Sequence, residues 1–247
     1  LADYASSPEL VLSAWNGKFQ FATEDEAEGV AGLRAPQIGA LHAISAHFAV
    51  GSQFEPATVV LPTGTGKTET MLATLVYRRL ARTLVLVPSV PLRSQMAGKF
   101  LSLGVLPDAG VVPHEIARPR VAALTAGVRT IEDAETLLRE ANVIVALPNT
   151  LEACEPEARR VLLEGCTDLM VDEAHHVTAS TWSSVRDKFS EKRIIQFTAT
   201  PFRRDSQRID GRIIFNFKLG DAQAAGYYRP INLIAVEEYG EQVRRDR

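Results

Sequence analysis

Three features that would place the chain outside the ordinary globular class are missing from the sequence. It has no run of about 18 apolar residues and no signal-like N-terminus, which argues against membrane insertion and secretion. Its only cysteines, Cys154 and Cys166, have neither metal-ligand spacing nor the density of a disulfide scaffold. We therefore expect a cytoplasmic protein with two reduced thiols and no membrane partner.

The sequence also lacks a basic excess, because the net charge of its 247 residues is −3. The charge is unevenly spread, because residues 1–30 contain several acidic side chains and only one basic side chain, that of Lys18. Basic residues thus remain available to the rest of the chain. Charge totals do not decide the partner, because a narrow phosphate-binding face can lie on an otherwise neutral protein.

Short apolar runs alternate with helix-compatible stretches through most of the chain. Buried strands are expected at 59–61, 83–87, 121–124, 143–146, 169–171 and 193–197. Helices are expected at 8–21, 37–48, 69–80, 92–103 and 131–140. This alternation is typical of an α/β fold with a mostly parallel sheet and helices on both faces. Ligands of such sheets bind beyond the carboxyl ends of the strands.

A glycine-rich loop at 62–68, with the sequence PTGTGKT, joins the first apolar strand to a helix. Glycines let backbone N–H groups wrap a polyphosphate, Lys67 can neutralise the β and γ phosphates, and Thr68 can offer a hydroxyl to Mg²⁺. The strict motif would place Gly where Leu61 stands, so the match fails at its first position. The strand before the loop and the helix after it favour a phosphate-binding loop over an ordinary turn. We expect Lys67 to face solvent when no nucleotide is bound.

An acidic pair, Asp172 and Glu173, follows another apolar strand. Mg²⁺ prefers oxygen ligands and keeps several waters, so Asp172 with Thr68 and two phosphate oxygens would suffice to hold it. Glu173 can polarise the water that attacks the γ-phosphate. A solvated acidic turn is the alternative reading. Together with the loop, the pair predicts an ATP-hydrolysing site with Lys67, Asp172 and Glu173 as catalytic residues.

The segments 64–68, 172–176 and 198–203 resemble motifs I, II and III of superfamily 2 helicases and translocases of the DEAH type. His176 and the segment 201–204 are similar to the DNA-directed branch that includes type I and type III restriction motors and excision-repair helicases. Weaker similarities follow in the family's order: the Q motif at 34–37, motif Ia at 88–95, motif Ib at 125–127 and a further strand-contacting motif at 148–151. The resemblance implies a RecA-like P-loop NTPase lobe.

The resemblance also implies roles for individual residues. The residues implied in ATP binding are Arg34, Gln37, Thr63, Gly64, Thr65, Gly66, Lys67 and Thr68, with Gln37 reading adenine. The implied Mg²⁺ ligands are Thr68 and Asp172. The residues implied in coupling hydrolysis to movement are His175, Thr198 and Thr200. The implied nucleic-acid contacts are Pro88, Ser89, Arg93, Thr125, Gly127, Asn149 and Thr150.

Motifs IV to VI of that family, which supply its arginine fingers, are not found in the sequence. The residues after Pro201 are too few for a second lobe of ordinary size. We therefore expect an accessory segment at 1–32, the first RecA-like ATPase lobe at 33–236, and at 237–247 the start of a linker towards an absent second lobe. The chain begins at Leu1 rather than Met, which fits a piece of a longer polypeptide.

Several functions remain open at this point. The leading hypothesis is the ATP-binding motor lobe of an ATP-dependent helicase that moves along or unwinds nucleic acid, with DNA favoured over RNA. The alternative is a double-stranded DNA translocase of a restriction or defence system that does not separate strands. A nucleotide-gated nucleic-acid-binding module would have a damaged motif II, and a kinase would need an acceptor pocket. The lobe alone is expected to be nearly inactive.

Overall fold

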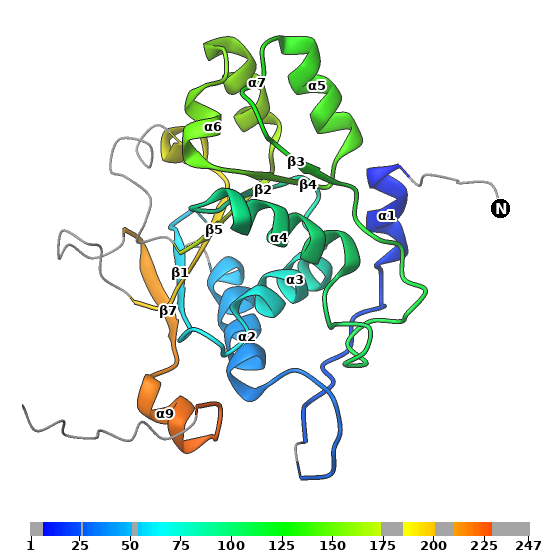
Figure 1. Cartoon of the computed structure of the whole chain (residues 1–247), viewed down its shortest axis with the longest axis vertical. Coiled ribbons are helices and arrows are strands. Elements are labelled where there is room, and N and C mark those ends of the chain that lie inside the picture. The colour runs from blue at the N-terminus through cyan, green and yellow to red at the C-terminus, as the bar shows by residue number, and fades with distance from the viewer. Residues whose placement is uncertain (1–6, 26, 51–53, 174–184, 201–209, 229–247) are drawn as a thin grey trace, which may run out of the picture.

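A seven-stranded sheet runs through the molecule, and all of its described strand pairs are parallel (Figure 1). The computed structural model describes residues 7–25, 27–50, 54–173, 185–200 and 210–228. The strands are β1 (Ala57–Val60), β2 (Thr83–Leu86), β3 (Val121–Ala123), β4 (Val143–Ala146), β5 (Asp168–Asp172), β6 (Arg193–Thr198) and β7 (Arg212–Asn216). Their order across the sheet is β3-β4-β2-β5-β6-β1-β7.

Helices cover both faces of this sheet. They are α1 (Pro8–Ala14), α2 (Ala35–Ala49), α3 (Lys67–Arg78), α4 (Val90–Ser102), α5 (Ile131–Glu140), α6 (Pro148–Glu152), α7 (Pro156–Gly165) and α9 (Leu219–Ala224). In Figure 1, α5, α6 and α7 lie on one side of the strands, and α2, α3 and α4 lie on the other. The predicted α/β fold is therefore confirmed.

Two hydrophobic cores explain why the strands lie in the middle layer. Successive strand side chains point to opposite faces, so Val85 and Val145 enter the core beneath α2, α3 and α4. Leu84 and Ile144 enter the core beneath α5 and α7. All four residues of β1, β2 and β4 are buried. This burial on both sides accounts for continuous apolar runs instead of alternating ones.

The N-terminal segment packs against the first of these cores. Trp15 is fully buried, and its indole Nε1 donates a hydrogen bond to the carbonyl oxygen of Ala117 at 2.8 Å. The helix predicted over 8–21 ends at Ala14, because Gly17 takes a positive φ of 66° and turns the chain. Phe19 then packs on Tyr77 with ring centroids 5.1 Å apart. The described residues of the predicted accessory segment thus contact the lobe closely.

Strand β7 was not expected from the sequence. It pairs with β1 at one edge of the sheet, with a register shift between Thr58 and Val59. Its residues are exposed or half-buried, although Ile213, Ile214 and Phe215 form a short apolar run. Both cysteines are buried free thiols, as predicted. Within the described ranges, no helix is long and apolar enough to cross a membrane.

Candidate functional site

Three neighbouring strands, β1, β6 and β5, bring the predicted catalytic segments to one edge of the sheet. Val60 at the end of β1 pairs with Thr198 at the end of β6, and Phe197 pairs with Asp172 at the end of β5. Because the strands are parallel, the glycine-rich loop, the predicted coupling segment and the acidic pair leave the same edge. The order of the strands, which the sequence does not reveal, therefore assembles the site.

The glycine-rich loop has the backbone that its sequence requires. Gly64 and Gly66 have φ values of 83° and 92°, in the region that L side chains rarely adopt. Thr65 is buried, and both its amide and its hydroxyl donate to the carbonyl oxygen of Pro62, at 3.2 and 2.7 Å. Thr63 lies exposed on the cavity side.

Helix α3 begins directly after this loop, at Lys67. Its N-cap, Gly66, provides no side-chain hydrogen bond to the first turn, so the positive end of the helix dipole is left for an anion. The hydroxyl-bearing residue Thr68 lines the same cavity. The loop and the helix N-terminus together form a site suited to phosphate.

Lys67 does not face solvent, which corrects the expectation from the sequence. Its Nζ lies 2.7 Å from Oε1 of Glu173, and the two side chains are only 10% and 21% exposed. Glu173 itself has a left-handed backbone conformation, with a φ of 49°. A cation and an acid at converging strand ends neutralise each other when no other charge lies between them.

Asp172 is more deeply buried than its neighbour, with 7% of its surface exposed. Desolvation raises the pKa of its carboxyl to about 6, helped by the nearby Glu173 charge and opposed by Lys67 and by a backbone hydrogen bond. That hydrogen bond comes from the Glu173 amide, which donates to Oδ1 of Asp172 at 3.1 Å. The aspartate would become a stronger acid on binding a cation, because a positive charge favours the ionised form.

Arg34 and Gln37 open helix α2 and brace the glycine-rich loop. Gln37 Oε1 accepts from the Arg34 amide at 2.7 Å, and its Nε2 donates to the Gly66 carbonyl oxygen at 3.3 Å. Arg34 Nη1 donates to the carbonyl oxygen of Gly64 at 3.0 Å. The structure therefore brings both predicted residues to the loop, although the amide of Gln37 is occupied by protein groups.

Two further residues at this place were missed by the sequence reasoning. Glu24 lies 3.4 Å from Arg34 Nε, and the guanidinium lies over the ring of Tyr227 at 4.9 Å from its centroid. Both residues are remote from the loop in sequence and match no motif, so only the fold reveals them. Arg34 is thus held by contacts from both ends of the described chain.

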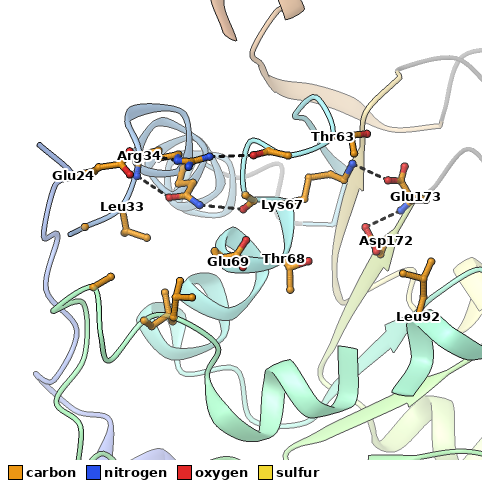
Figure 2. A pocket seen from close by; sticks show the side chains of 17 residues that line it. Glu24, Leu33, Arg34, Thr63, Lys67, Thr68, Glu69, Leu92, Asp172 and Glu173 are labelled. Atoms are coloured by element: carbon orange, nitrogen blue, oxygen red, sulfur yellow. Dashed lines mark hydrogen bonds and ion pairs between the residues drawn. The ribbon is translucent and has the colours of Figure 1, made fainter. Parts of the chain in front are cut away.

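A cavity of about 520 Å³ joins these groups (Figure 2). Lys67 and Glu173 lie at one side of it, and Glu24 and Arg34 lie at the other. Of the predicted ATP, metal and catalytic residues, all line it except the buried Thr65. A volume of this size is in the range of small-molecule sites.

Two of the predicted coupling residues, Thr198 and Thr200, are described, and neither lines the cavity. Thr198 is buried at the end of β6, and its hydroxyl donates to the carbonyl oxygen of Thr200 at 2.7 Å. The Thr200 amide in turn donates to the same hydroxyl at 3.2 Å. This pair fixes the turn after β6. His175 lies outside the described residues, as do the segment 174–184 and the segment 201–209.

The predicted nucleic-acid contacts follow three neighbouring strands at the same edge of the sheet. Pro88 and Ser89 follow β2, while Thr125 and Gly127 follow β3. Asn149 and Thr150 follow β4, in α6. Because β3, β4 and β2 are adjacent, these positions form one continuous band beside the cavity.

Arg93 differs from the rest of this band. Its side chain is 8% exposed, and Nη1 donates to the carbonyl oxygen of Leu124 at 2.9 Å. The exposed guanidinium that a phosphate contact needs is not found there. Arg93 instead ties α4 to the chain that leaves β3, and so positions the band.

Comparison with known proteins gives a family and a fold. The sequence model of the family described as type III restriction enzyme, res subunit, matches residues 31–203. The chain is similar to a type ISP restriction-modification enzyme, LlaGI, solved with a DNA substrate mimic, with a TM-score of 0.54 and 20% identity over 79% of this chain and 20% of that one. None of the curated proteins compared matches the chain.

Two helicase structures are similar to the chain with TM-scores close to that of the restriction enzyme. The UvsW helicase of bacteriophage T4 has a TM-score of 0.52 and 15% identity, over 84% of this chain and 67% of its own. The helicase MrfA, solved with DNA and AMPPNP, has a TM-score of 0.51 and 14% identity, over 85% of this chain and 29% of its own. At these identities the likeness shows the fold, a RecA-like lobe. The chain spans about a fifth of the length of the restriction enzyme.

Proposed function

The chain belongs to the family of the type III restriction enzyme res subunit, and from this we propose that it is the ATP-binding lobe of a motor that hydrolyses ATP to move along or unwind DNA. One observation carries the proposal. Lys67, after the loop that follows β1, and the acidic pair Asp172 and Glu173, at the end of β5, converge in one cavity at a helix N-terminus. A structural ion pair alone would not require the positive-φ glycine loop that faces it.

The residues present fit a nucleoside triphosphate with Mg²⁺. The N-terminus of α3 and Lys67 supply positive charge for the phosphates, and Glu173 is the base that takes the proton of the attacking water. Thr68 and Asp172 would hold Mg²⁺, which supplies charge neutralisation at the phosphates.

A Glu173→Gln substitution in the full-length motor tests the base assignment. ATP and Mg²⁺ binding should persist, because the amide keeps the shape, while hydrolysis should be lost, because the amide cannot accept the proton. Glu132→Gln in exposed α5 is a matched control and should leave turnover unchanged. Normal hydrolysis by the Glu173 variant would contradict the assignment and would favour a binding module without turnover.

Double-strand translocation without unwinding is the second candidate, and the family favours it because its description names a restriction enzyme subunit. The element that separates strands usually lies outside this lobe. A strand-displacement assay and a triplex-displacement assay on the full-length protein distinguish a helicase from a translocase. Displacement of a triplex strand without duplex separation identifies a translocase, whereas both activities identify a helicase.

DNA is the proposed partner, together with a second RecA-like lobe in the parent chain. The similar restriction enzyme and MrfA were both solved with DNA or a DNA mimic, which supports DNA over RNA. Phosphate contacts by backbone amides and hydroxyls in the band at 88–89, 125–127 and 149–150 would track a strand without reading its sequence. The buried free thiols support a cytoplasmic location, where thiols stay reduced.

A further inference from the structure

The cavity has two chemically different ends, and only one of them suits phosphate. The end at Lys67 has the cation and the helix N-terminus. The other end has an acid beside Arg34, labelled Glu24 in Figure 2, and apolar side chains. Part of that apolar lining comes from the chain after α4, which lies against the N-terminal segment through the Gln20 amide and the Val111 carbonyl oxygen, 2.8 Å apart. Glu24 and Leu33 lie at this end in Figure 2, and the apolar lining of the cavity also includes Val105, Leu106 and Ala109.

We propose that Glu24 is a specificity-determining residue, whose carboxylate accepts a hydrogen bond from the exocyclic 6-amino group of the adenine in bound ATP. The inference rests on the proposed function, since it places the phosphates at Lys67. Glu24 lies at the side of the cavity away from Lys67, which begins α3, so it lies at the end that is left for the base. The apolar side chains around it suit the faces of a purine, which is flat and weakly polar.

The backbone holds Glu24 at this place. Its amide donates to the Leu33 carbonyl oxygen at 3.0 Å, and the Leu33 amide donates to the Ala22 carbonyl oxygen at 2.7 Å. Gly32 lies so close to Glu24 that a Cβ on it would come within 2.4 Å of the Glu24 amide nitrogen. The segments 22–25 and 30–33 therefore lie side by side, and the Glu24 side chain lines the cavity.

Glu24 has more accepting capacity available to a ligand than Gln37 has. Gln37 is 5% exposed, with its oxygen bonded to the Arg34 amide and its nitrogen bonded to Gly66. Glu24 keeps 30% of its side chain exposed and lies 3.4 Å from Arg34 through Oε2 alone. Among the described residues, Oε1 of Glu24 has no hydrogen-bond or ion-pair partner, so it can accept from a ligand.

The chemistry of this acceptor selects one purine edge. An ionised carboxylate only accepts hydrogen bonds, and the 6-amino group of adenine donates. Inosine triphosphate presents a carbonyl oxygen at the same position, which the carboxylate repels. Purine riboside triphosphate, which has only hydrogen there, keeps the shape and loses the donor. A charge-assisted hydrogen bond of this kind changes affinity on the order of tenfold.

Binding of three triphosphates by the 247-residue chain and its variants tests the inference. The parent should bind ATP more tightly than purine riboside triphosphate, and more tightly still than inosine triphosphate. Glu24→Ala should weaken ATP about tenfold and leave purine riboside triphosphate unchanged, so that their affinity ratio falls to near one. Glu24→Gln keeps an acceptor oxygen, so its affinity for ATP should lie between that of the parent and that of Glu24→Ala. Glu28→Ala removes an exposed acid of the same loop and should change neither affinity.

The contrary results are distinct from one another. An equal loss for ATP and purine riboside triphosphate in Glu24→Ala would show that Glu24 acts only through Arg34. Unchanged affinities would show that it does not contact the base. Either result overturns the inference and leaves the proposed function standing. Failure of the parent chain to bind any of the triphosphates would overturn both.

Discussion

The effect of Lys67 on nucleotide binding depends on its ion pair with Glu173 as well as on its own charge. Its ammonium is paired with Glu173 at 2.7 Å in a partly buried place, so a bound polyphosphate must compete with that carboxylate. The competition is favourable because a triphosphate carries several charges and also meets the helix N-terminus of α3. Without ligand, Lys67 and Glu173 neutralise each other, and the buried Asp172 carboxyl is the further acid of the site.

A Lys67→Ala substitution should therefore have two effects. ATP affinity should fall at least tenfold, because the charge that meets the β and γ phosphates is removed. Stability should fall on the order of 1 to 3 kcal/mol, because the pair is largely buried and the Glu173 carboxylate would lose its cation. Titration calorimetry and thermal unfolding measure the two effects. Lys188→Ala, which removes an exposed ion pair with Glu164, is the control. Equal ATP binding by the Lys67 variant and the parent would refute the phosphate-loop assignment.

Asp172 gives the nucleotide-free protein a pH dependence with a definite sign. Burial raises the pKa of its carboxyl to about 6, above the unfolded value of 3.8, so ionisation destabilises the folded state at neutral pH. The penalty is fully present above pH about 6 and disappears as the pH falls towards 4, where both states are protonated. The ionised Asp172 carboxylate therefore lowers the stability of the nucleotide-free protein, and binding of a cation would offset this loss.

Asp172→Asn should stabilise the nucleotide-free and metal-free chain. The gain should be on the order of 1 to 3 kcal/mol at pH 8 and should shrink as the pH falls below 6. Urea unfolding at pH 8 and pH 5 measures the difference in free energy of unfolding between variant and parent. Because the two proteins are compared at the same pH, the contributions of other titrating groups cancel. Asp187→Asn, at an exposed position, should show no such gain. A gain that grows on acidification would contradict the raised pKa.

At the scale of elements, the site depends on a contact between α2 and the glycine-rich loop. A Cβ on Gly66 would lie 1.9 Å from Nε2 of Gln37, and the φ of 92° disfavours any L side chain. Gln37 cannot move freely, because its oxygen is bonded to the first turn of its own helix. The loop and α2 therefore adopt their positions together.

Gly66→Ala should reduce nucleotide affinity strongly and lower the melting temperature, because both the strained φ and the contact with Gln37 would have to be relieved. Gly98→Ala is a matched control within α4, where no atom lies within 4 Å of the added Cβ. It should raise stability by up to about 1 kcal/mol and leave nucleotide binding unchanged. Similar behaviour of the two variants would show that the loop does not need its glycine.

The sequence predicts those elements whose signals are local. Helix α5 begins and ends as expected, because Thr130 caps it and accepts a hydrogen bond from the Asp133 amide. Strand β4 has its expected bounds, because all four residues are apolar and buried. Strand β7 was missed because it lies at the sheet edge with mostly exposed side chains. Its assignment depends on pairing with β1, which sequence periodicity does not report.

In the candidate site, too, the sequence predicts local features and does not predict contacts between distant segments. The phosphate loop and the acidic pair could be located from sequence, because their chemistry requires particular residue types after a strand. The burial of Arg93 and the pairing of Lys67 with Glu173 could not, since both depend on contacts between distant segments. The contacts of Glu24 and Tyr227 with Arg34 are of the same kind. Composition placed Glu24 in an acidic segment and gave no sign of the cavity.

For the whole molecule, charge at the cavity limits what this lobe does alone. Among the residues that the structure describes, the cations that line it are Arg34 and Lys67. Arg34 is held by the Gly64 carbonyl oxygen, the Glu24 carboxylate and the Tyr227 ring, which leaves Lys67 to meet a γ-phosphate. Charge spreads over the transferring phosphoryl group in its transition state, and a single lysine with Mg²⁺ neutralises it only in part.

The 247-residue chain by itself should therefore bind ATP weakly and hydrolyse it very slowly, even with DNA present. A longer chain that includes a second lobe should turn over on the order of 10³ to 10⁵ faster, the usual effect of arginine fingers in phosphate-loop enzymes. DNA binding by the short chain should be weak and should fall as salt rises, because a partial phosphate track displaces few counterions. Steady-state ATPase rates of both chains, with and without DNA, measure the difference. Comparable DNA-stimulated rates would show that these residues contain the complete site, and the proposal of a second lobe would then fail.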